Sequence, residues 1–253
     1  MLKEMKLLRS AAVIATLFSA VLSTSSVATA NKVSAASNTA DMPSINNISN
    51  INIDKQASMT TNADEQEAQR SKDKLMAKLS KIDFFSADFS QKIFDEAGIE
   101  LQQGSGRLSV SKPNLVNWQT TLPDESLIVS DGSNLWFYDP FVEQVSVYSL
   151  ANAIANTPIL LITSNDEKLW QDYNVSQLSQ HSYLVSANNN NARVKSLELT
   201  FTEDANNVEL SAFNILDATG QLSVITLSNH NEKPDSSLFT FTVPEGVYLG
   251  DQR

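Results

Sequence analysis

The chain has 253 residues, of which 42% are hydrophobic and none is cysteine, and its net charge is −11. An acidic surface of this kind excludes nucleic acid as a partner and favours a basic protein surface instead. The lack of cysteine excludes disulfides, a lipid attached to cysteine and a usual zinc site. The length fits one sizeable domain behind a processed leader.

The first 30 residues have the pattern of a cleaved signal peptide. Basic residues precede an apolar segment at 11–22, and Ala28-Thr29-Ala30 provides a small-residue cleavage site, with a second possible cut after Ala36. The apolar segment is short for a helix that spans a bilayer. We therefore expect an exported chain, free of the membrane after cleavage, whose net charge becomes −13 once residues 1–30 are removed.

A polar segment separates this leader from the first predicted helix. Residues 31–63 are rich in Asn, Ser, Thr and Ala, which predicts a disordered arm. An amphipathic helix is predicted from about Asn62 to Ile82, because Asn62 and Glu65 have the spacing of a capping box. Its apolar face would consist of Ala68, Leu75, Met76, Leu79 and Ile82.

The segment 104–144 predicts neighbouring strands of an antiparallel sheet. Pro and Asp-Gly or Asp-Pro dipeptides divide it into short runs, and Asp131-Gly132 suits a tight hairpin. The run Leu135-Trp136-Phe137-Tyr138 is apolar at every position, so both faces of this strand should be covered. One of these two covers could be a ligand.

The segment after the predicted sheet contains a short apolar helix. Thr157-Pro158 provides an N-cap followed by proline at the first helical position. The next four residues are apolar around the whole circumference, so this helix is either an ordinary core helix or a cover over an apolar surface. These residues are Ile159, Leu160, Leu161 and Ile162.

The rest of the chain alternates between apolar and polar residues. Strands are predicted around 197–201, 208–213, 222–227 and 239–243, with Asn-, Asp- and Gly-rich turns between them. Evenly spaced short strands indicate an antiparallel sheet curled into a barrel or a sandwich.

The sequence contains no recognisable catalytic constellation. His181 and His230 are the only histidines, and there is no Gly-x-Ser-x-Gly motif or complete dinucleotide-binding loop. We therefore expect neither an enzyme nor a cofactor or metal site.

Several motifs in continuous order carry a family resemblance. They are Phe85-x-Ala87-x-Phe89-x-Gln91, Gly104-x-Gly106-x-Leu108, Lys112-Pro113-x-x-x-x-Trp118, Asp131-Gly132-x-x-x-Trp136-x-Tyr138-Asp139-Pro140, Gln144 and Asn156-Thr157-Pro158. Together they resemble the outer-membrane lipoprotein carrier family, LolA. The resemblance implies one domain over 64–253, mainly β with some α: an incomplete antiparallel β-barrel, or half-barrel, covered by a short helical lid.

The resemblance also implies a function. A member of this family is a monomeric periplasmic chaperone that binds the acyl chains of triacylated lipoproteins. It would receive them from an inner-membrane ABC lipoprotein transporter and deliver them to an outer-membrane lipoprotein receptor. The alternative is a periplasmic lipid-binding or lipoprotein-sensing module of the same fold. Such relatives tend to carry a further C-terminal domain, and this chain ends soon after its last predicted strand, which favours the carrier.

Site residues follow from the same resemblance and from the apolar context. The lid would be Ile159 to Ile162, and the wall of the lipid cavity would include Leu115, Trp118, Leu127, Val129, Trp136, Tyr138 and Phe141. The family places an arginine that latches the lid where this chain has Lys112. Because an ammonium lacks the planar fork of a guanidinium, Lys112 would form a weaker latch, or else would be a solvated lysine at a strand edge.

Overall fold

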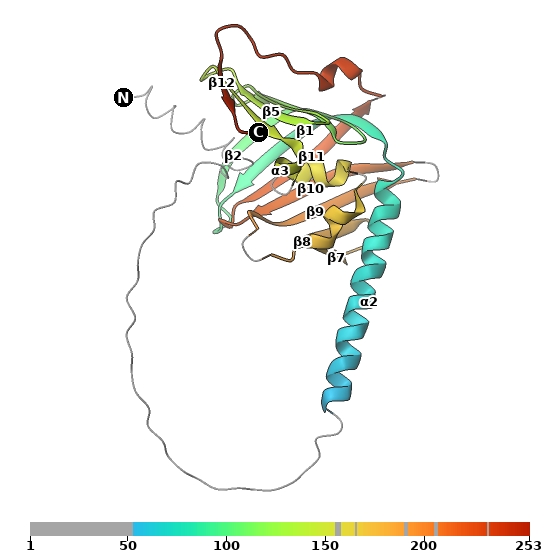
Figure 1. The fold of residues 1–253 in the computed structure, drawn as a ribbon. Helices are drawn as coiled ribbons and strands as arrows, with labels where there is room; N and C mark the ends of the chain where they lie inside the picture. Colours follow the sequence, from blue (N-terminus) through green and yellow to red (C-terminus); the bar gives the residue numbers. More distant parts are fainter. Residues whose placement is uncertain (1–52, 155–157, 165, 190–191, 205–206, 232) are drawn as a thin grey trace, which may run out of the picture.

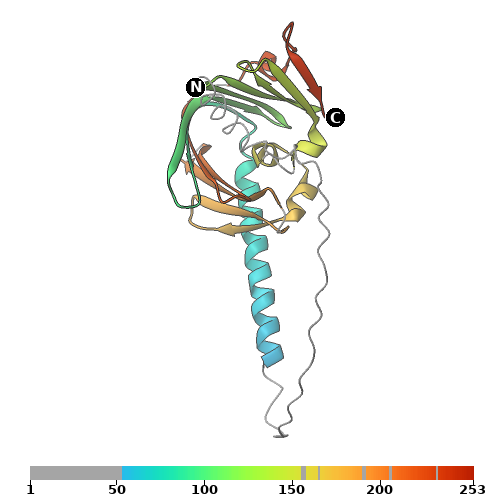
Figure 2. The ribbon, with the colours of Figure 1, turned by 90° about the vertical axis from the view of Figure 1, so that its left-hand side faces the viewer.

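The computed structural model describes residues 53–253, apart from 155–157, 165, 190–191, 205–206 and 232, with side chains from Glu65 onward. The predicted leader and the segment 31–52 lie outside the described residues. The described part of the chain begins with a long helix, α2, and continues into one large sheet that curls around short helices (Figures 1 and 2).

The elements follow one another closely along the chain. Their bounds are α2 Ile53–Leu79, β1 Phe84–Phe94, β2 Glu100–Ser111, β3 Leu115–Leu122, β4 Ser126–Asp131, β5 Asn134–Asp139, β6 Gln144–Ser149, α3 Leu150–Ile154, α4 Pro158–Thr163, η1 Glu167–Asp172, β7 Tyr173–Gln177, β8 Ser182–Ala187, β9 Val194–Glu203, β10 Val208–Asp217, β11 Leu222–Asn231, η2 Ser236–Phe239 and β12 Tyr248–Asp251.

Twelve strands of the described chain form a single sheet in the order β12-β6-β5-β4-β3-β2-β1-β11-β10-β9-β8-β7. Neighbours pair antiparallel, except that β12 runs parallel to β6. The first and last strands of this order, β12 and β7, are not paired with each other, so the curled sheet stays open. This confirms the expected mainly-β fold with an incomplete barrel.

Helix α2 ends against the open side of the sheet. Its buried side chains include Leu75 and Leu79, as the sequence pattern predicts, together with Ser71. Polar contacts add to this packing: Lys72 Nζ donates to the Trp170 carbonyl oxygen at 2.5 Å, and Lys78 forms an ion pair with Glu203. Burial, followed by the nearby charge of Lys81, lowers the pKa of Lys78.

The start of α2 differs from the prediction. The helix begins at Ile53, so Asn62 lies inside it and cannot be its N-cap, and the stretch 53–63 is helical rather than a disordered arm. Neither proline nor glycine occurs between Pro43 and Ile82. Without such a breaker, a helix supported at its C-terminal end can propagate through polar residues, because each added residue gains one more backbone hydrogen bond.

The inner face of the sheet and the short helices share one hydrophobic core. Buried side chains from every layer belong to it, including Leu75 of α2, Leu108 of β2, Phe213 of β10 and Leu160 of α4. Gly106 allows β2 to approach β3 closely, because a Cβ there would lie 1.9 Å from the Gln119 carbonyl oxygen. The glycine at this position is therefore a requirement of packing.

The outer face of β3–β5 is covered by the chain that connects β11 to β12. We call residues 233–247 the strap, because they cross from β11 at the middle of the sheet to the edge strand β12 (Figure 1). Phe239 in the strap is buried, and Asn117 Nδ2 of β3 donates to the Leu238 carbonyl oxygen at 2.7 Å. The strap thus closes a second, smaller apolar layer.

The prediction of a strand at 239–243 is wrong. This stretch leaves η2 in an extended conformation at Thr240 but joins no strand of the sheet. Its alternation of aromatic and Thr residues reflects an extended chain that presses one side onto the outer face, since any extended segment alternates its side chains. The hairpin at Asp131-Gly132 is confirmed, with Gly132 at φ +89° between β4 and β5.

Candidate functional site

The inner face of the sheet is aromatic at its centre. Trp118 of β3 is 3% exposed, and its ring lies 5.3 Å from that of Phe89 and 5.8 Å from that of Phe213, both in edge-on geometry. These three residues come from β3, β1 and β10, which the curl of the sheet brings together. Edge-on aromatic pairs add stability beyond their buried area, so this cluster is a firm floor for the core.

Helix α4, the predicted lid, packs into the same core as this aromatic cluster. Ile159, Leu160, Leu161 and Ile162 are all buried and belong to the same core as Trp118. A six-residue helix has too few internal hydrogen bonds to be stable alone, so its packing holds it in place. The prediction that this helix is buried or covers something apolar is confirmed.

The end of the lid is joined to the β2–β3 turn. The Asn114 amide donates to the Thr163 carbonyl oxygen at 3.2 Å, and Ile162 and Thr163 border a cavity of about 10 Å³. A space of that size is at the lower limit for a single water molecule. In this conformation the gap beside Ile162 and Thr163 is therefore too small for an acyl chain.

Lys112, the predicted latch, points into the same region. Its Nζ donates to the Leu79 carbonyl oxygen, the last residue of α2, at 2.6 Å, and its side chain borders the gap beside Ile162. Burial lowers the pKa of Lys112, and the nearby carboxylate of Asp83 opposes that shift. Lys112 is therefore not a solvated lysine. It connects the end of α2 to the β2–β3 turn, and that turn also hydrogen-bonds Thr163 at the end of α4. A direct bond from Lys112 to α4 stays a prediction.

The predicted cavity wall does not form one surface. Successive residues of a strand face opposite sides, and directly paired residues share a side. Trp118 pairs with Ile128 on the inner face, whereas Leu127 pairs with Tyr138 and Val129 with Trp136 on the outer face. Leu115, next to the inner-facing Val116, also lies on the outer face, and Phe141 is 58% exposed in the β5–β6 turn.

Strand register is the reason for this correction. Of the seven residues predicted for the wall, only Trp118 belongs to the core that contains α4, and five lie on the outer face. The ring of Phe241 lies 5.5 Å from Trp136 and 6.0 Å from Tyr138. The strand 135–138 is thus covered on both faces, as predicted, but its outer cover is the chain itself rather than a ligand.

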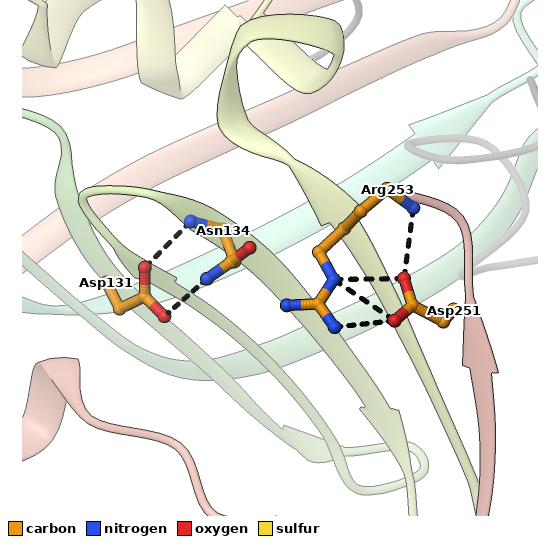
Figure 3. A network of polar contacts seen from close by, with 4 residues as sticks. All are labelled: Asp131, Asn134, Asp251 and Arg253. Atoms are coloured by element: carbon orange, nitrogen blue, oxygen red, sulfur yellow. Dashed lines mark hydrogen bonds and ion pairs between the residues drawn. The ribbon is translucent and has the colours of Figure 1, made fainter.

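A polar network fixes Trp136 in the outer layer. Its indole Nε1 donates to Asp131 Oδ2 at 2.8 Å, and the Ser133 amide donates to Asp131 Oδ1. The Asn134 amide donates to the same Oδ1 (Figure 3). Burial favours the neutral form of Asp131, but the hydrogen bonds from Trp136, Asn134 and Ser133 outweigh it, and the pKa of this carboxyl is lowered.

The C-terminal residue extends this network. The Arg253 guanidinium lies 6.0 Å from the Trp136 ring and hydrogen-bonds the Asp251 carboxylate through Nε and Nη2 (Figure 3). These hydrogen bonds from Arg253 lower the pKa of Asp251 to about 2. The last turn of chain is thereby held on the outer face beside β5.

Sequence reasoning missed most of the inner surface. Phe89 and Phe213 were placed in strands without a role, although both lie against Trp118. Alternation within β1 and β10 identifies each of them as inward-facing once Trp118 is known to be inward. The missing information was the pairing of β1 with β11, which joins two halves of the chain more than 100 residues apart.

Two features are absent from the described residues, namely a cluster of metal ligands and a helix that could span a membrane. Within them, no three His, Asp or Glu side chains gather as a metal site would require. No described helix combines the length and the apolar composition that crossing a bilayer would take.

An open, curled sheet with an aromatic inner face and a short apolar helix in its core defines the class of half-barrel folds. The family model for the outer membrane lipoprotein carrier protein LolA matches residues 80–242. The chain belongs to the LolA family.

Relatives within the family are similar over nearly their whole length. An outer-membrane lipoprotein carrier protein of Aeromonas salmonicida is 45% identical over 181 residues, which is 71% of this chain and 88% of that protein. Those of Photorhabdus laumondii and Yersinia enterocolitica are each 42% identical over 180 residues, 71% of this chain and 87% of theirs. A solved LolA superfamily protein from Nitrosomonas europaea is 14% identical, covering 69% of this chain and 98% of its own, with a TM-score of 0.43.

Proposed function

We propose that this protein is a periplasmic carrier of lipoproteins. It receives triacylated lipoproteins from an inner-membrane ABC transporter, holds their acyl chains between the inner face and α4, and passes them to an outer-membrane receptor. The observation that carries this proposal is the lid: four apolar side chains buried over an aromatic floor, on a helix too short to be stable alone. Membership of the LolA family supports it.

The energetics of the lid suit a carrier that must also release its cargo. Burying one acyl chain of about 15 methylenes gains about 12 kcal/mol at roughly 0.8 kcal/mol each. Exposing the four lid side chains costs about 6–12 kcal/mol at roughly 1.5–3 kcal/mol each. The lid therefore offsets part of the gain from the three chains of a triacylated cargo, which weakens binding and favours release.

The direction of transfer is set by the partners in this proposal. The transporter supplies energy, so the carrier itself performs no chemical step and needs no cofactor. The net charge of −11 favours association with a basic receptor surface over an anionic membrane. The protein acts as a monomer, because one sheet and one lid complete the proposed site.

A release assay tests the proposal. Protein without residues 1–30 is added to spheroplasts that synthesise a labelled outer-membrane lipoprotein, and the supernatant is analysed by size-exclusion chromatography. We expect a one-to-one complex with acylated cargo and none with cargo whose acylated cysteine is replaced by serine. Free lipid co-purifying in place of lipoprotein would instead indicate a lipid-binding or sensing protein and would overturn the carrier proposal.

A further inference from the structure

A second cavity opens beside the lid gap and is mostly polar. This side cavity has a volume of about 280 Å³, close to the lower end for small-ligand sites. Its polar wall comes from three parts of the chain: Lys81 and Asp83 after α2, Asn207 and Glu209 at the start of β10, and His230 near the end of β11. A cavity built from three separate segments is a feature of the fold rather than of one loop.

The polar groups of the side cavity are oriented by bonds to the protein. His230 Nε2 lies 3.0 Å from the Leu210 carbonyl oxygen, which can only accept, so Nε2 carries the proton. In the neutral imidazole Nδ1 is then an acceptor. It lies 3.7 Å from Glu209 Oε2, while Asn207 Nδ2 donates to Glu209 Oε1 at 2.7 Å.

This arrangement leaves two acceptors side by side. When the imidazole is neutral, Nδ1 of His230 and Oε2 of Glu209 both present lone pairs, and at 3.7 Å they form no hydrogen bond with each other. An N–H donor placed between them would satisfy both. Lys81 contributes an ammonium to the same wall, which provides a donor for a carbonyl oxygen. The site therefore matches a ligand that carries both amide N–H and carbonyl groups.

The side cavity adjoins the apolar gap beneath the lid. Ile82, Phe85 and Leu210 border both spaces, so one apolar partition separates the polar chamber from Ile162 of α4. A ligand that displaces these partition side chains can extend from one space into the other. Such a ligand would be apolar at one end and amide-like at the other.

We propose that the side cavity binds the polar head of an acylated peptide, namely its N-acyl amide, its glyceryl ester carbonyls and its first peptide bonds. This inference rests on the proposed function and adds to it: the acyl chains lie under the lid, and the polypeptide leaves through the side cavity. An N–H of the peptide donates to Glu209 and His230, and Lys81 donates to a carbonyl oxygen. Recognition here distinguishes a lipopeptide from a free fatty acid.

The test compares two probes on the protein without residues 1–30. One is a synthetic triacylated cysteinyl peptide and the other is palmitate, and both displace a fluorescent fatty acid. Glu209→Ala and His230→Gln should each weaken lipopeptide binding about tenfold, as expected for one hydrogen bond to a charged or polar group, and leave palmitate binding unchanged. The matched control is Glu125→Ala, an exposed acid in the β3–β4 turn.

A cross-linking experiment keeps the test independent of folding effects. The photoreactive residue p-benzoylphenylalanine replaces Asn207 in one sample and the exposed Gln119 in another. Labelling of the peptide part from position 207 but not 119 supports the proposal. Variants that lose affinity equally for both probes, or for neither, overturn it, and so does the absence of labelling from position 207. A wild-type protein that binds neither probe overturns the proposed function itself.

Discussion

Asp131 shows how one carboxylate can organise the outer layer. It accepts hydrogen bonds from two backbone amides of the β4–β5 turn and from the indole of Trp136. The turn and the aromatic residue that covers it are therefore held by the same group. The lowered pKa of Asp131 means that these bonds stabilise its charged form.

Asp131→Ala should lower the free energy of unfolding by about 1–3 kcal/mol at pH 7, because it leaves amide and indole donors without their acceptor. A carboxyl whose pKa is lowered on folding stabilises the fold above its unfolded pKa, near 3.8, and loses that effect as pH falls through the folded pKa. Urea denaturation at pH 7 and at successively lower pH measures this. Equal destabilisation at all pH values would contradict the role of the charge.

Lys112 gives a prediction of the same pH direction, but in the alkaline range. Burial lowers its pKa, so the folded state releases this proton more readily than the unfolded state. Stability should then rise with pH between the lowered pKa and 10.5, where the unfolded lysine also deprotonates. The difference in urea midpoint between wild type and Lys112→Met, followed from pH 8 to 10.5, should show this rise. A constant difference over that range would mean that burial of the Lys112 ammonium does not lower the free energy of unfolding.

At the scale of elements, the strap replaces what would be a second layer of strands. Phe239 is buried in it, and Phe241 lies against Trp136 and Tyr138. Each aromatic residue covers the outer face of strands whose inner face belongs to the main core. The strap is thus a structural element of the outer layer that touches neither Trp118 nor the lid in the described contacts.

Phe241→Ala should lower the free energy of unfolding by about 1–3 kcal/mol, since Phe241 is only half-buried, and Phe239→Ala should cost about 3–5 kcal/mol. Thermal and urea denaturation provide the measurement. Neither substitution should change acyl-chain binding, because both act on the outer face. Loss of binding in a variant that keeps its fold would place the strap at the lipid site.

The sequence predicts elements whose pattern is local, and fails where position depends on distant pairing. The hairpin at Gly132, the buried lid and the apolar face of α2 at Leu75 and Leu79 follow from turn chemistry and periodicity alone. The face on which Trp136 lies does not, because one residue of register decides it. The strap was misread for a related reason: extended segments alternate whether or not they join a sheet.

At the scale of the molecule, one sheet serves two separate layers. The inner layer is closed by the short helix α4, which moves in the proposed function, and the outer layer by a strap tied through side chains and a parallel strand, β12. In the proposed function, the cover of the inner face moves and the cover of the outer face stays in place. A carrier can therefore expose its inner face to cargo while the outer face keeps the sheet in shape.

The two tryptophans Trp118 and Trp136 test this division directly. Trp118→Ala removes the centre of the inner floor, so it should reduce acyl-chain binding, about tenfold or more, besides lowering stability by about 3–5 kcal/mol. Trp136→Ala breaks the bond to Asp131 and the contact with Phe241, so it should lower stability and leave the affinity of the folded protein for acyl chains unchanged. Displacement of a fluorescent fatty acid at a temperature where both variants are folded separates the effects. If Trp136→Ala alone abolished binding, the acyl chains would have to occupy the outer face, and the strap rather than α4 would be the movable cover.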